Sequence, residues 1–525
     1  MNPGQLKNKI QTYEILSWLL LALAFIYTIL RACYLGITHD EAVTYLYWAS
    51  GRVHDILLYT GFAPPNNHLL NSLLIKLAIT FFGLSEFTIR IPALIGHALY
   101  LVAAYKTLKL FLKEHLMVCG LCVLIFNPFM LQLFAIGRGY ALGLGFSSIG
   151  IYFLLKYIKD QHDCLLLGNV LNERLKQRKD SSVFWGFLMF ALATISTFTF
   201  FHLYLAALVW IVGYEIKIKR ALGRLILPSL LLLLSTCLIP IIKIHASHHF
   251  IAEIGKEGFW RNTVLSLIDG TLYNQAYSLH WLMSMSQCFV IDVIVIAIVL
   301  VIFSLCSKEK IFQDPTFALL RCVSIWLMIC CFVIVLEGTV IRFGYSEGRT
   351  AIYFIPLFYL LLLLVIQCFF ILGQKIHLLR TGVNCFVVLL AFICLYHFIY
   401  CANLKSFYKT GAYEESSREA INYLKQWRKD EHLKDRSLSI GTHRNFTPLL
   451  NFYIIKDNVP WLKTLPYQED LHGDFDYYYL SANNNESLEK SEMDGELKTA
   501  LLGKNLKVIK VFADATYLAR AYGLK

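Results

Sequence analysis

Two adjacent carboxylates, Asp40 and Glu41, follow the first long apolar segment of the chain, in the stretch GITHDEAVTYLYWASG at residues 36–51. A carboxylate at the edge of the hydrocarbon is unfavourable unless it faces water or a partner, so this acidic pair needs a reason. One reason is structural: Thr38 or Asp40 could cap a helix over 41–50, and the aromatic residues that follow are typical of membrane-interface anchors. The other reason is chemical, because a positioned carboxylate can accept the proton of a hydroxyl nucleophile.

Arginine residues occur at two further positions beside apolar segments. Arg138 lies in AIGRGYA, a turn too short to leave the membrane zone, and Arg349 directly precedes a long apolar segment. Each guanidinium could simply snorkel or form a structural pair, but guanidinium groups also bind phosphate through two parallel hydrogen bonds. A topology derived without these residues puts Asp40, Arg138 and Arg349 on one side of the membrane, which favours a shared site.

Asparagine and histidine side chains are further candidates for substrate or metal contacts. Asn67 and His68 lie in PPNNHLLNSLL, His202 lies in FTFFHLY, and HASHHF occupies residues 245–250. HASHHF is irregular in its ligand spacing, so exposed polar residues explain it at least as well as a metal site. No cofactor is predicted with certainty, although a divalent cation that bridges a carboxylate and a phosphate is compatible with this set.

The composition indicates a protein that crosses the membrane many times. Of the 525 residues, 57% are hydrophobic and only 16% are charged, whereas soluble domains contain roughly a quarter charged residues. Because about 20 apolar residues cross a bilayer as a helix, we expect about 11 spans. The expected spans are 15–36, 88–111, 115–135, 140–158, 183–200, 202–217, 223–244, 287–307, 317–337, 350–372 and 382–401. The pair 183–200 and 202–217 also fits a re-entrant hairpin.

The positions of lysine and arginine predict the orientation. With the N-terminus in the cytoplasm, five basic loops all fall inside, as the positive-inside rule requires. The C-terminus then lies outside, as do the outer loops 37–87 and 245–286. Within the first of these loops, the apolar stretch 69–83 is short for a span and suits a helix that lies along the membrane interface.

From residue 402 onward the composition changes to a balanced mixture of acidic and basic residues. Residues 414–430 have a helical period, while SLSIG, DYYYLS and NLKVIKVFADATYLARA resemble short strands. We therefore predict a transmembrane domain at 1–401 and a soluble α/β domain at 402–525, outside the membrane. Since this second region contains no cysteine, disulfides cannot stabilise it.

The sequence lacks motifs that are typical of a nucleotide-powered pump or of a soluble nucleotide-sugar enzyme. It contains no P-loop, no dinucleotide-binding glycine motif, no zinc-protease motif and no nucleophile elbow. The formal net charge of +12 could suggest nucleic acid as a partner, but the basic residues cluster in short loops between apolar segments, where they set topology.

Taken together, these motifs resemble the GT-C membrane glycosyltransferases, particularly the protein O-mannosyltransferases and the bacterial aminoarabinose transferases. The resemblance rests on THDEAVTYLYWA, NNHLLNSLL, AIGRGYALGLGFSSIGIYFLL, FHLYLAAL and GRTAIYFIPLFYLLLL, whose order and sidedness match. It implies a GT-C fold, a polyprenyl-phosphate-linked sugar donor, and a glycan, lipid or protein acceptor on the outer face of a bacterial inner membrane.

The same resemblance implies roles for single residues. Asp40 corresponds to a catalytic aspartate and Glu41 to its acidic neighbour, while Arg138 and Arg349 correspond to positions near the lipid phosphate. Where some relatives have a lysine in the first loop, this chain has NNHLL, so Asn67 and His68 are candidates to replace it.

Two other functions remain open at this point. A transporter or flippase for a lipid-linked glycan would place charged residues near the middle of the membrane and often contains internal repeats, neither of which is evident. An assembly scaffold would need far fewer spans than are predicted here.

Overall fold

The computed structural model describes most of the chain, with gaps. The described residues are 3–60, 66–166, 173–217, 228–235, 238, 242, 255–273, 280–342, 344–406, 416–430, 436–464, 474–481, 506–512, 514 and 516–521. The predicted span 223–244 and the HASHHF stretch lie largely or wholly outside them.

The chain divides into two compact units, and most of the loop 37–87 belongs with the C-terminal region. The helical unit contains Met1–Ile29, His68–Asn71 and Pro92–Ala402. The mixed unit contains Leu30–Asn67, Ser72–Ile91 and Asn403–Lys525. Each unit is described by itself below.

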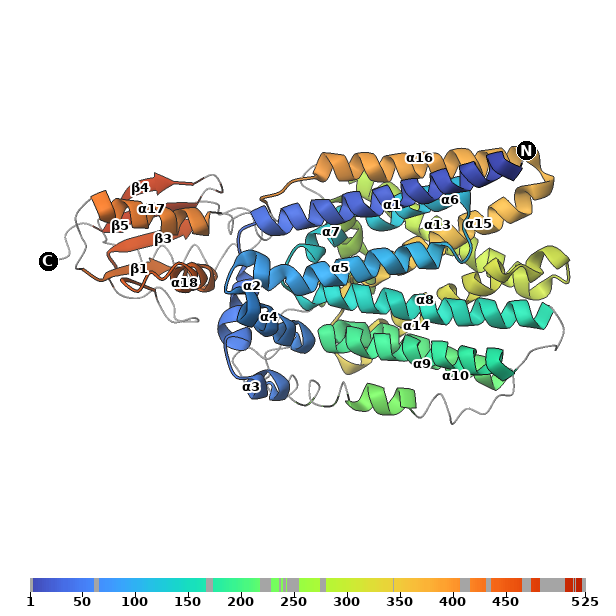
Figure 1. The fold of residues 1–525 in the computed structure, drawn as a ribbon, viewed down its shortest axis with the longest axis horizontal. Helices are drawn as coiled ribbons and strands as arrows, with labels where there is room; N and C mark the ends of the chain where they lie inside the picture. The colour runs from blue at the N-terminus through green and yellow to red at the C-terminus, as the bar shows by residue number, and fades with distance from the viewer. Residues whose placement is uncertain are drawn as a thin grey trace. The chain divides into compact units, whose positions relative to one another are not determined.

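The helical unit is a bundle of long apolar helices (Figure 1). Among the described residues, eight helices are long and apolar enough to cross a membrane, and a bent pair makes a ninth. The eight candidate spans are Gln11–Tyr34, Glu86–Leu108, Gly139–Asp163, Phe198–Ile216, Trp281–Cys306, Pro315–Val340, Phe354–Leu372 and His377–Cys401. They lie in α1 (Pro3–Tyr34), α5 (Glu86–Leu108), α8 (Gly139–Leu166), η3 and α10 (Phe198–Phe200 and Phe201–Lys217), α13 (His280–Cys306), α14 (Pro315–Leu336) with part of η8 (Glu337–Ile341), α15 (Phe354–Leu372) and α16 (His377–Cys401).

Two further predicted spans in the described part of the chain differ from a single long helix: one is bent and the other is short. The predicted span 115–135 consists of α6 (Glu114–Ile125) and α7 (Pro128–Phe134), bent by 66°. Asn127 caps α7 by accepting a 3.0 Å hydrogen bond from the Met130 N–H, and Pro128 cannot donate a backbone hydrogen bond, so the break follows from the sequence. The predicted span 183–200 corresponds to the shorter apolar part Ser181–Ser196 of α9 (Glu173–Ser196).

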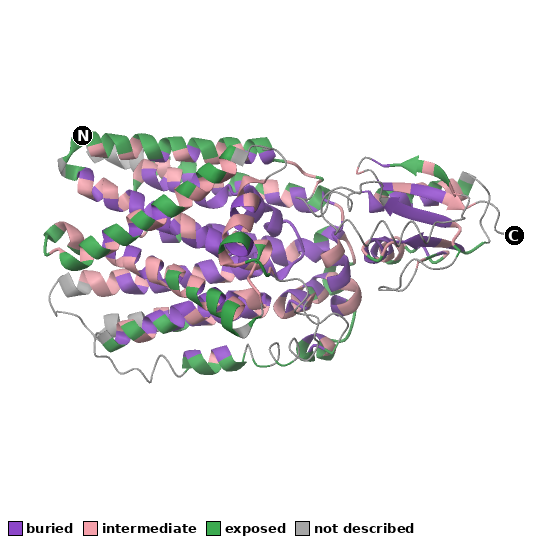
Figure 2. Ribbon diagram, turned by 180° about the vertical axis from the view of Figure 1, so that it is seen from behind, coloured by how far each residue is buried: buried purple, intermediate pink, exposed green. Residues whose placement is uncertain are grey.

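The surfaces of these helices are consistent with a membrane environment. Large apolar side chains are exposed on the outer helices, for example Leu378 and Phe392 on α16. Figure 2 shows exposed positions on the outer faces of the helices and buried positions on the faces turned toward neighbours. Since lipid covers such outer faces at no hydrophobic cost, this pattern supports the predicted polytopic membrane fold.

The mixed unit contains a five-stranded sheet in the order β2-β1-β3-β5-β4. Strands β1 (Leu438–Thr442), β2 (Leu462–Thr464) and β3 (Tyr477–Ser481) are parallel, with Ile440 opposite Thr464 and Tyr477. Strands β4 (Leu506–Val511) and β5 (Thr516–Ala521) form an antiparallel pair that joins the sheet at β3. The helices α17 (Ser417–Asp430) and α18 (Thr447–Lys456) complete the predicted small α/β architecture.

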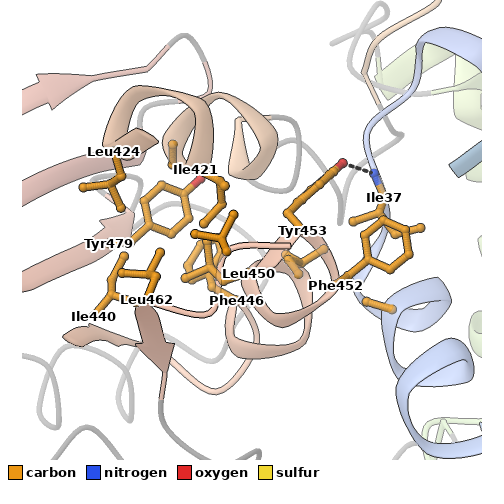
Figure 3. Close-up of a cluster of buried hydrophobic side chains, with 14 of the residues drawn as sticks. Ile37, Ile421, Leu424, Ile440, Phe446, Leu450, Phe452, Tyr453, Leu462 and Tyr479 are labelled. Carbon is orange, nitrogen blue, oxygen red and sulfur yellow. Dashed lines mark hydrogen bonds between the residues drawn. The ribbon is translucent and has the colours of Figure 1, made fainter. Parts of the chain in front are cut away.

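One hydrophobic core joins this sheet region to the loop 37–87. Apolar side chains of α17, α18 and the strands pack with Ile37, Ala42 and Ala49 from the loop, as Figure 3 shows for Ile37. The loop itself forms α2 (His39–Thr44), the π-helix η1 (Tyr45–Ala49), α3 (Val53–Leu58) and α4 (Leu69–Phe82), the last being the predicted short apolar helix. The core therefore links segments that lie more than 300 residues apart in the sequence.

Candidate functional site

Asp40 and Glu41 lie in the first turn of α2, and the structure gives them different environments. Thr38 is the N-cap: its backbone N–H donates to Glu41 Oε2 at 2.9 Å, and its hydroxyl accepts from the Glu41 N–H at 3.4 Å. This capping box uses Glu41 and leaves the Asp40 carboxylate out of the cap. Asp40 is half-buried, whereas Glu41 is fully buried.

Arg90 of α5 holds Glu41 in a complete hydrogen-bond arrangement. Its Nε lies 2.8 Å from Glu41 Oε1 and its Nη2 lies 2.8 Å from Oε2. Its remaining N–H groups donate to the carbonyl oxygens of Ala32, Leu35 and Gly36 at 3.0, 2.7 and 2.6 Å. A buried guanidinium with all five donors used fixes the end of α1 relative to the start of α2, and thereby the position of Asp40.

The aromatic residues that follow Asp40 differ in burial: Trp48 is buried, whereas Tyr45 and Tyr47 are half-buried. Trp48 is buried in η1 and contacts the Tyr59 ring at 6.3 Å between centroids. Lys76 of α4 donates to the carbonyl oxygens of Gly51 at 2.6 Å and Ala49 at 3.2 Å, which satisfies the end of this π-helix.

Asn67 and His68, predicted as a pair, have separate roles in the structure. The Asn67 amide donates to the Ile56 carbonyl oxygen at 2.9 Å and accepts from the Ser72 hydroxyl at 2.9 Å, so it joins the α3 and α4 regions of the mixed unit. His68 belongs to the helical unit, where its ring lies edge-on to Tyr140 at 5.2 Å.

The Arg138 turn is tightly packed. Arg138 is 3% exposed, and the Asn71 amide donates to the Gly137 carbonyl oxygen at 2.9 Å. A Cβ atom at Gly139 would lie 1.8 Å from the Ser196 carbonyl oxygen and 2.9 Å from His68 Cβ, so only glycine fits between them. This close approach is what brings His68 to the start of α8.

Arg349 lies in the 3₁₀ helix η9 (Gly348–Ala351), and its guanidinium carbon is 6.0 Å from the Tyr140 ring centroid. Tyr140 therefore contacts both His68 and Arg349, and it follows Arg138 by two residues. Two predicted residues, His68 and Arg349, thus contact one buried tyrosine, and a third, Arg138, lies in the turn directly before it. We call His68, Arg138, Tyr140 and Arg349 the Tyr140 cluster. Arg342 lies at the end of η8 with a left-handed backbone.

The segment 255–273 holds the backbone beside Arg349 in place. In the π-helix η5 (Phe259–Leu265), Asn262 donates to Glu347 Oε2 at 3.1 Å, and Thr263 donates to the Ser346 carbonyl oxygen at 2.6 Å. The Gly348 N–H donates to Ser266 Oγ at 2.9 Å, at the start of α12 (Ser266–Leu272). These three contacts position the residues immediately before Arg349.

The segment 255–273 also contacts the bent helix pair that precedes Arg138. The Asn127 amide donates to Thr271 Oγ1 at 3.3 Å, and the Tyr273 hydroxyl donates to Gln132 Oε1 at 2.6 Å. The segment 255–273 therefore hydrogen-bonds both the residues before Arg349 and the helix pair that precedes Arg138.

His202 pairs with a carboxylate that sequence reasoning missed. Its Nε2 is 2.7 Å from Glu337 Oε2, and its Nδ1 is 3.0 Å from the Thr199 carbonyl oxygen. Its ring also lies 5.9 Å from that of Tyr353, four residues after Arg349. A carboxylate at the end of an apolar segment was the available signal for Glu337, and an arginine near the start of one was the signal for Arg90.

Three π-helices occur among the described residues, and each adjoins these sites. They are η1, which directly follows the α2 helix of Asp40 and Glu41, η5, which contains Asn262, and η8, which begins at Glu337. Single-turn π-helices are rare and frequently occur at functional sites, so this distribution supports the choice of residues.

Each unit has side chains suited to a different chemical step. The helical unit supplies guanidinium groups suited to a phosphate, and the mixed unit supplies a half-buried carboxylate suited to a hydroxyl proton. No group of three or more histidine, cysteine, aspartate or glutamate side chains in the described ranges could hold a metal ion.

Comparisons with known proteins establish the fold. No protein-family model matches the sequence, and no curated protein matches it. ArnT from Cupriavidus metallidurans bound to undecaprenyl phosphate matches with a TM-score of 0.51 and 11% identity, over 95% of this chain and 97% of that one. This match shows the GT-C fold over nearly the whole chain.

Two further solved structures were found. ArnT in the apo state matches with a TM-score of 0.46 and 12% identity, over 95% of this chain and 97% of that one. The archaeal oligosaccharyltransferase AglB from Archaeoglobus fulgidus, in complex with an inhibitory peptide and a dolichol-phosphate, matches with a TM-score of 0.43 and 12% identity, over 89% of this chain and 69% of that one.

Proposed function

We propose that this chain is a membrane glycosyltransferase that moves a sugar from a polyprenyl-phosphate-linked donor to an acceptor on the outer, periplasmic face of a bacterial inner membrane. The observation that carries the proposal is the Tyr140 cluster, which joins Arg349 and the Arg138 turn in a chain with the fold of ArnT. The ArnT structure itself contains undecaprenyl phosphate, a lipid phosphate of the class proposed here.

Arg138 and Arg349 are the proposed ligands of the donor phosphate. When the bond between the anomeric carbon and the phosphate oxygen breaks, its electron pair stays on the phosphate, whose negative charge increases. Fixed guanidinium groups stabilise this increased charge more than the smaller charge of the phosphodiester in the bound donor, which is the requirement for catalysis. The aromatic ring of Tyr140 beside Arg349 restricts the orientation of the guanidinium.

Asp40 is the proposed general base, or the carboxylate that orients the acceptor. As the acceptor hydroxyl oxygen forms its bond to the anomeric carbon, its proton passes to Asp40, which contributes typically about 10²–10⁴-fold to the rate. Attack opposite the departing phosphate inverts the anomeric configuration. The prenyl tail stays in the hydrocarbon throughout, which explains why the acid lies at the rim of the membrane.

Glu41, His68, His202 and Asn67 receive supporting roles in this proposal. Because both oxygens of Glu41 are bound by Arg90 and the side chain is fully buried, we assign it to positioning Asp40 and not to contact with substrate. His68 contacts the Tyr140 ring, and we propose that it lies beside the donor headgroup. His202 is paired with Glu337. Asn67 serves the loop structure through Ile56 and Ser72.

The proposal is tested by reconstituting the full-length protein in liposomes with a panel of radiolabelled undecaprenyl-phosphate sugars. Membranes from cells that lack the protein supply the acceptor. Release of undecaprenyl phosphate together with transfer of label to another molecule supports the proposal. Movement of the intact donor between leaflets without cleavage would indicate the alternative, a flippase. If the panel is neither cleaved nor moved, although undecaprenyl phosphate itself binds, the proposed donor class is wrong.

A further inference from the structure

The linker between α1 and α2, residues 35–38, has its backbone held by side chains from distant elements. Arg90 binds the carbonyl oxygens of Leu35 and Gly36. The Ile37 N–H donates to the Tyr453 hydroxyl at 3.0 Å, and the Thr38 N–H donates to Glu41. The four-residue linker before α2 is thus fixed by Arg90 of α5 and by Tyr453 of the C-terminal region.

Tyr453 reaches this linker from α18, and it is itself rigid. Its side chain is 1% exposed, and Figure 3 shows the hydroxyl group directed at the Ile37 nitrogen. Burial, followed by the nearby charge of Glu86, raises the pKa of Tyr453 to about 12, so the group remains a neutral hydroxyl at physiological pH. The bond is therefore present over the whole pH range in which a cell operates.

Apolar packing supports the same contact. Phe452, the neighbour of Tyr453, lies edge-on to Tyr45 with ring centroids 5.7 Å apart, and Tyr45 immediately follows α2. Ile37 and Ala42 are buried in the same core as Leu449 and Leu450 of α18. The helix that carries Asp40 thus has α18 on one of its sides.

Charge pairing fixes α18 to the start of α5. Glu86 forms ion pairs with Arg418 of α17 and, at 2.7 Å, with Lys456 of α18. Glu86 is four residues before Arg90, which is one helical turn. This turn of α5 therefore binds the C-terminal region through Glu86 and binds α2 through Arg90. The three elements α2, α5 and α18 are mutually linked.

From these contacts we propose that the C-terminal α/β region is the positioning element of the Asp40 helix, and that Tyr453 is its positioning residue. Only the expected effect on turnover rests on the function proposed above. The restraint of the linker backbone by Tyr453 does not depend on that function. A catalytic carboxylate must be held within a fraction of an ångström of its working position. The helix α2 has only six residues, so it cannot hold Asp40 this closely by itself.

The experiment compares two tyrosine-to-phenylalanine variants of the full-length protein by hydrogen–deuterium exchange. Tyr453→Phe leaves the Ile37 N–H buried without its acceptor. Tyr479→Phe is the matched control, because the Tyr479 hydroxyl is equally buried and bonds Thr516 at 3.1 Å, with no contact to the linker. We expect amides of 37–44 to exchange about tenfold faster in Tyr453→Phe and unchanged in Tyr479→Phe. Equal exchange in the two variants would overturn the proposal.

A second variant and a second readout keep the test decisive. If Tyr453→Phe does not accumulate, Phe452→Leu removes the Tyr45 contact while retaining an apolar side chain, and the same peptides should exchange faster. In the transfer assay, Tyr453→Phe should lower kcat about tenfold without raising the KM for the donor, whereas Tyr479→Phe should leave both unchanged per folded molecule. If Asp40→Asn remains active, the proposed role of Asp40 fails but the exchange result still decides this inference.

Discussion

At the scale of single residues, the acidic pair separates into one carboxylate for chemistry and one for structure. Asp40→Asn should reduce sugar transfer by about 10²–10⁴-fold, because an amide cannot accept the proton of the acceptor, while the protein still folds and inserts. The matched control is Asp55→Asn in α3, whose carboxylate binds the Thr60 hydroxyl and has its pKa lowered by that bond. Transfer rates per folded molecule measure the difference, and full activity of Asp40→Asn would remove this residue from the mechanism.

The buried pair of Arg90 and Glu41 gives a stability prediction. Arg90→Lys keeps the charge, but an ammonium group offers three donors in place of five and cannot bind both carboxylate oxygens and three carbonyl oxygens together. We expect the free energy of unfolding to fall by about 3–5 kcal/mol. The change is measured from the lower midpoint of thermal unfolding in detergent. Lys109→Ala is the control, because it breaks an exposed pair with Glu14 and should cost no more than about 1 kcal/mol. Similar losses in the two variants would contradict the central position assigned to Arg90.

Sequence reasoning could identify charged residues at unusual positions but not their partners. Asp40, Arg138 and Arg349 were recognisable because each adjoins an apolar segment. The pairing of Glu41 with Arg90, and of His202 with Glu337, depends on how distant helices pack, which no local pattern encodes. Tyr140 was likewise not recognisable, because a tyrosine at the start of a span looks like any interfacial anchor.

At the scale of elements, the segment 255–273 is predicted to control donor binding through the residues before Arg349. Asn262→Ala removes the contact to Glu347 and also the acceptor for the Glu257 and Gly258 N–H groups. We expect the affinity for undecaprenyl phosphate to fall about tenfold, since the Arg349 backbone is then less restrained. Binding to undecaprenol, which lacks the phosphate, serves as the reference for tail contacts in the same titration.

A double-mutant cycle shows whether Asn262 acts through Arg349. If it does, Asn262→Ala should weaken binding no further in the background of Arg349→Ala. Asn384→Ala is the control in the same unit, because its side chain bonds His115 at 3.0 Å and contacts none of the residues around Tyr140. Additive effects of Asn262→Ala and Arg349→Ala would show that the segment 255–273 has a separate role.

At the scale of the whole molecule, apolar periodicity predicted the membrane fold well because about 20 residues of hydrocarbon-compatible helix form a strong signal. Pro128 at the first position of α7 also explains the bend between α6 and α7, which lies within a segment that we predicted as one span. The shared core of the mixed unit was not predictable in the same way. Ile37 and Leu450 share one core only because the chain returns to the first loop after the last span.

The orientation of the chain in the membrane is the remaining prediction at this scale. Ser437 in the mixed unit and Lys308, after α13, are both exposed. With the N-terminus in the cytoplasm, the positive-inside rule places Ser437 outside and Lys308 inside. In intact cells, Ser437→Cys should therefore react with a membrane-impermeant maleimide, whereas Lys308→Cys should react only after lysis. The unsubstituted protein, whose own cysteines lie in apolar segments, gives the background. The opposite labelling pattern would place Asp40 on the cytoplasmic side, and the proposed lipid-linked donor would then have to be used there.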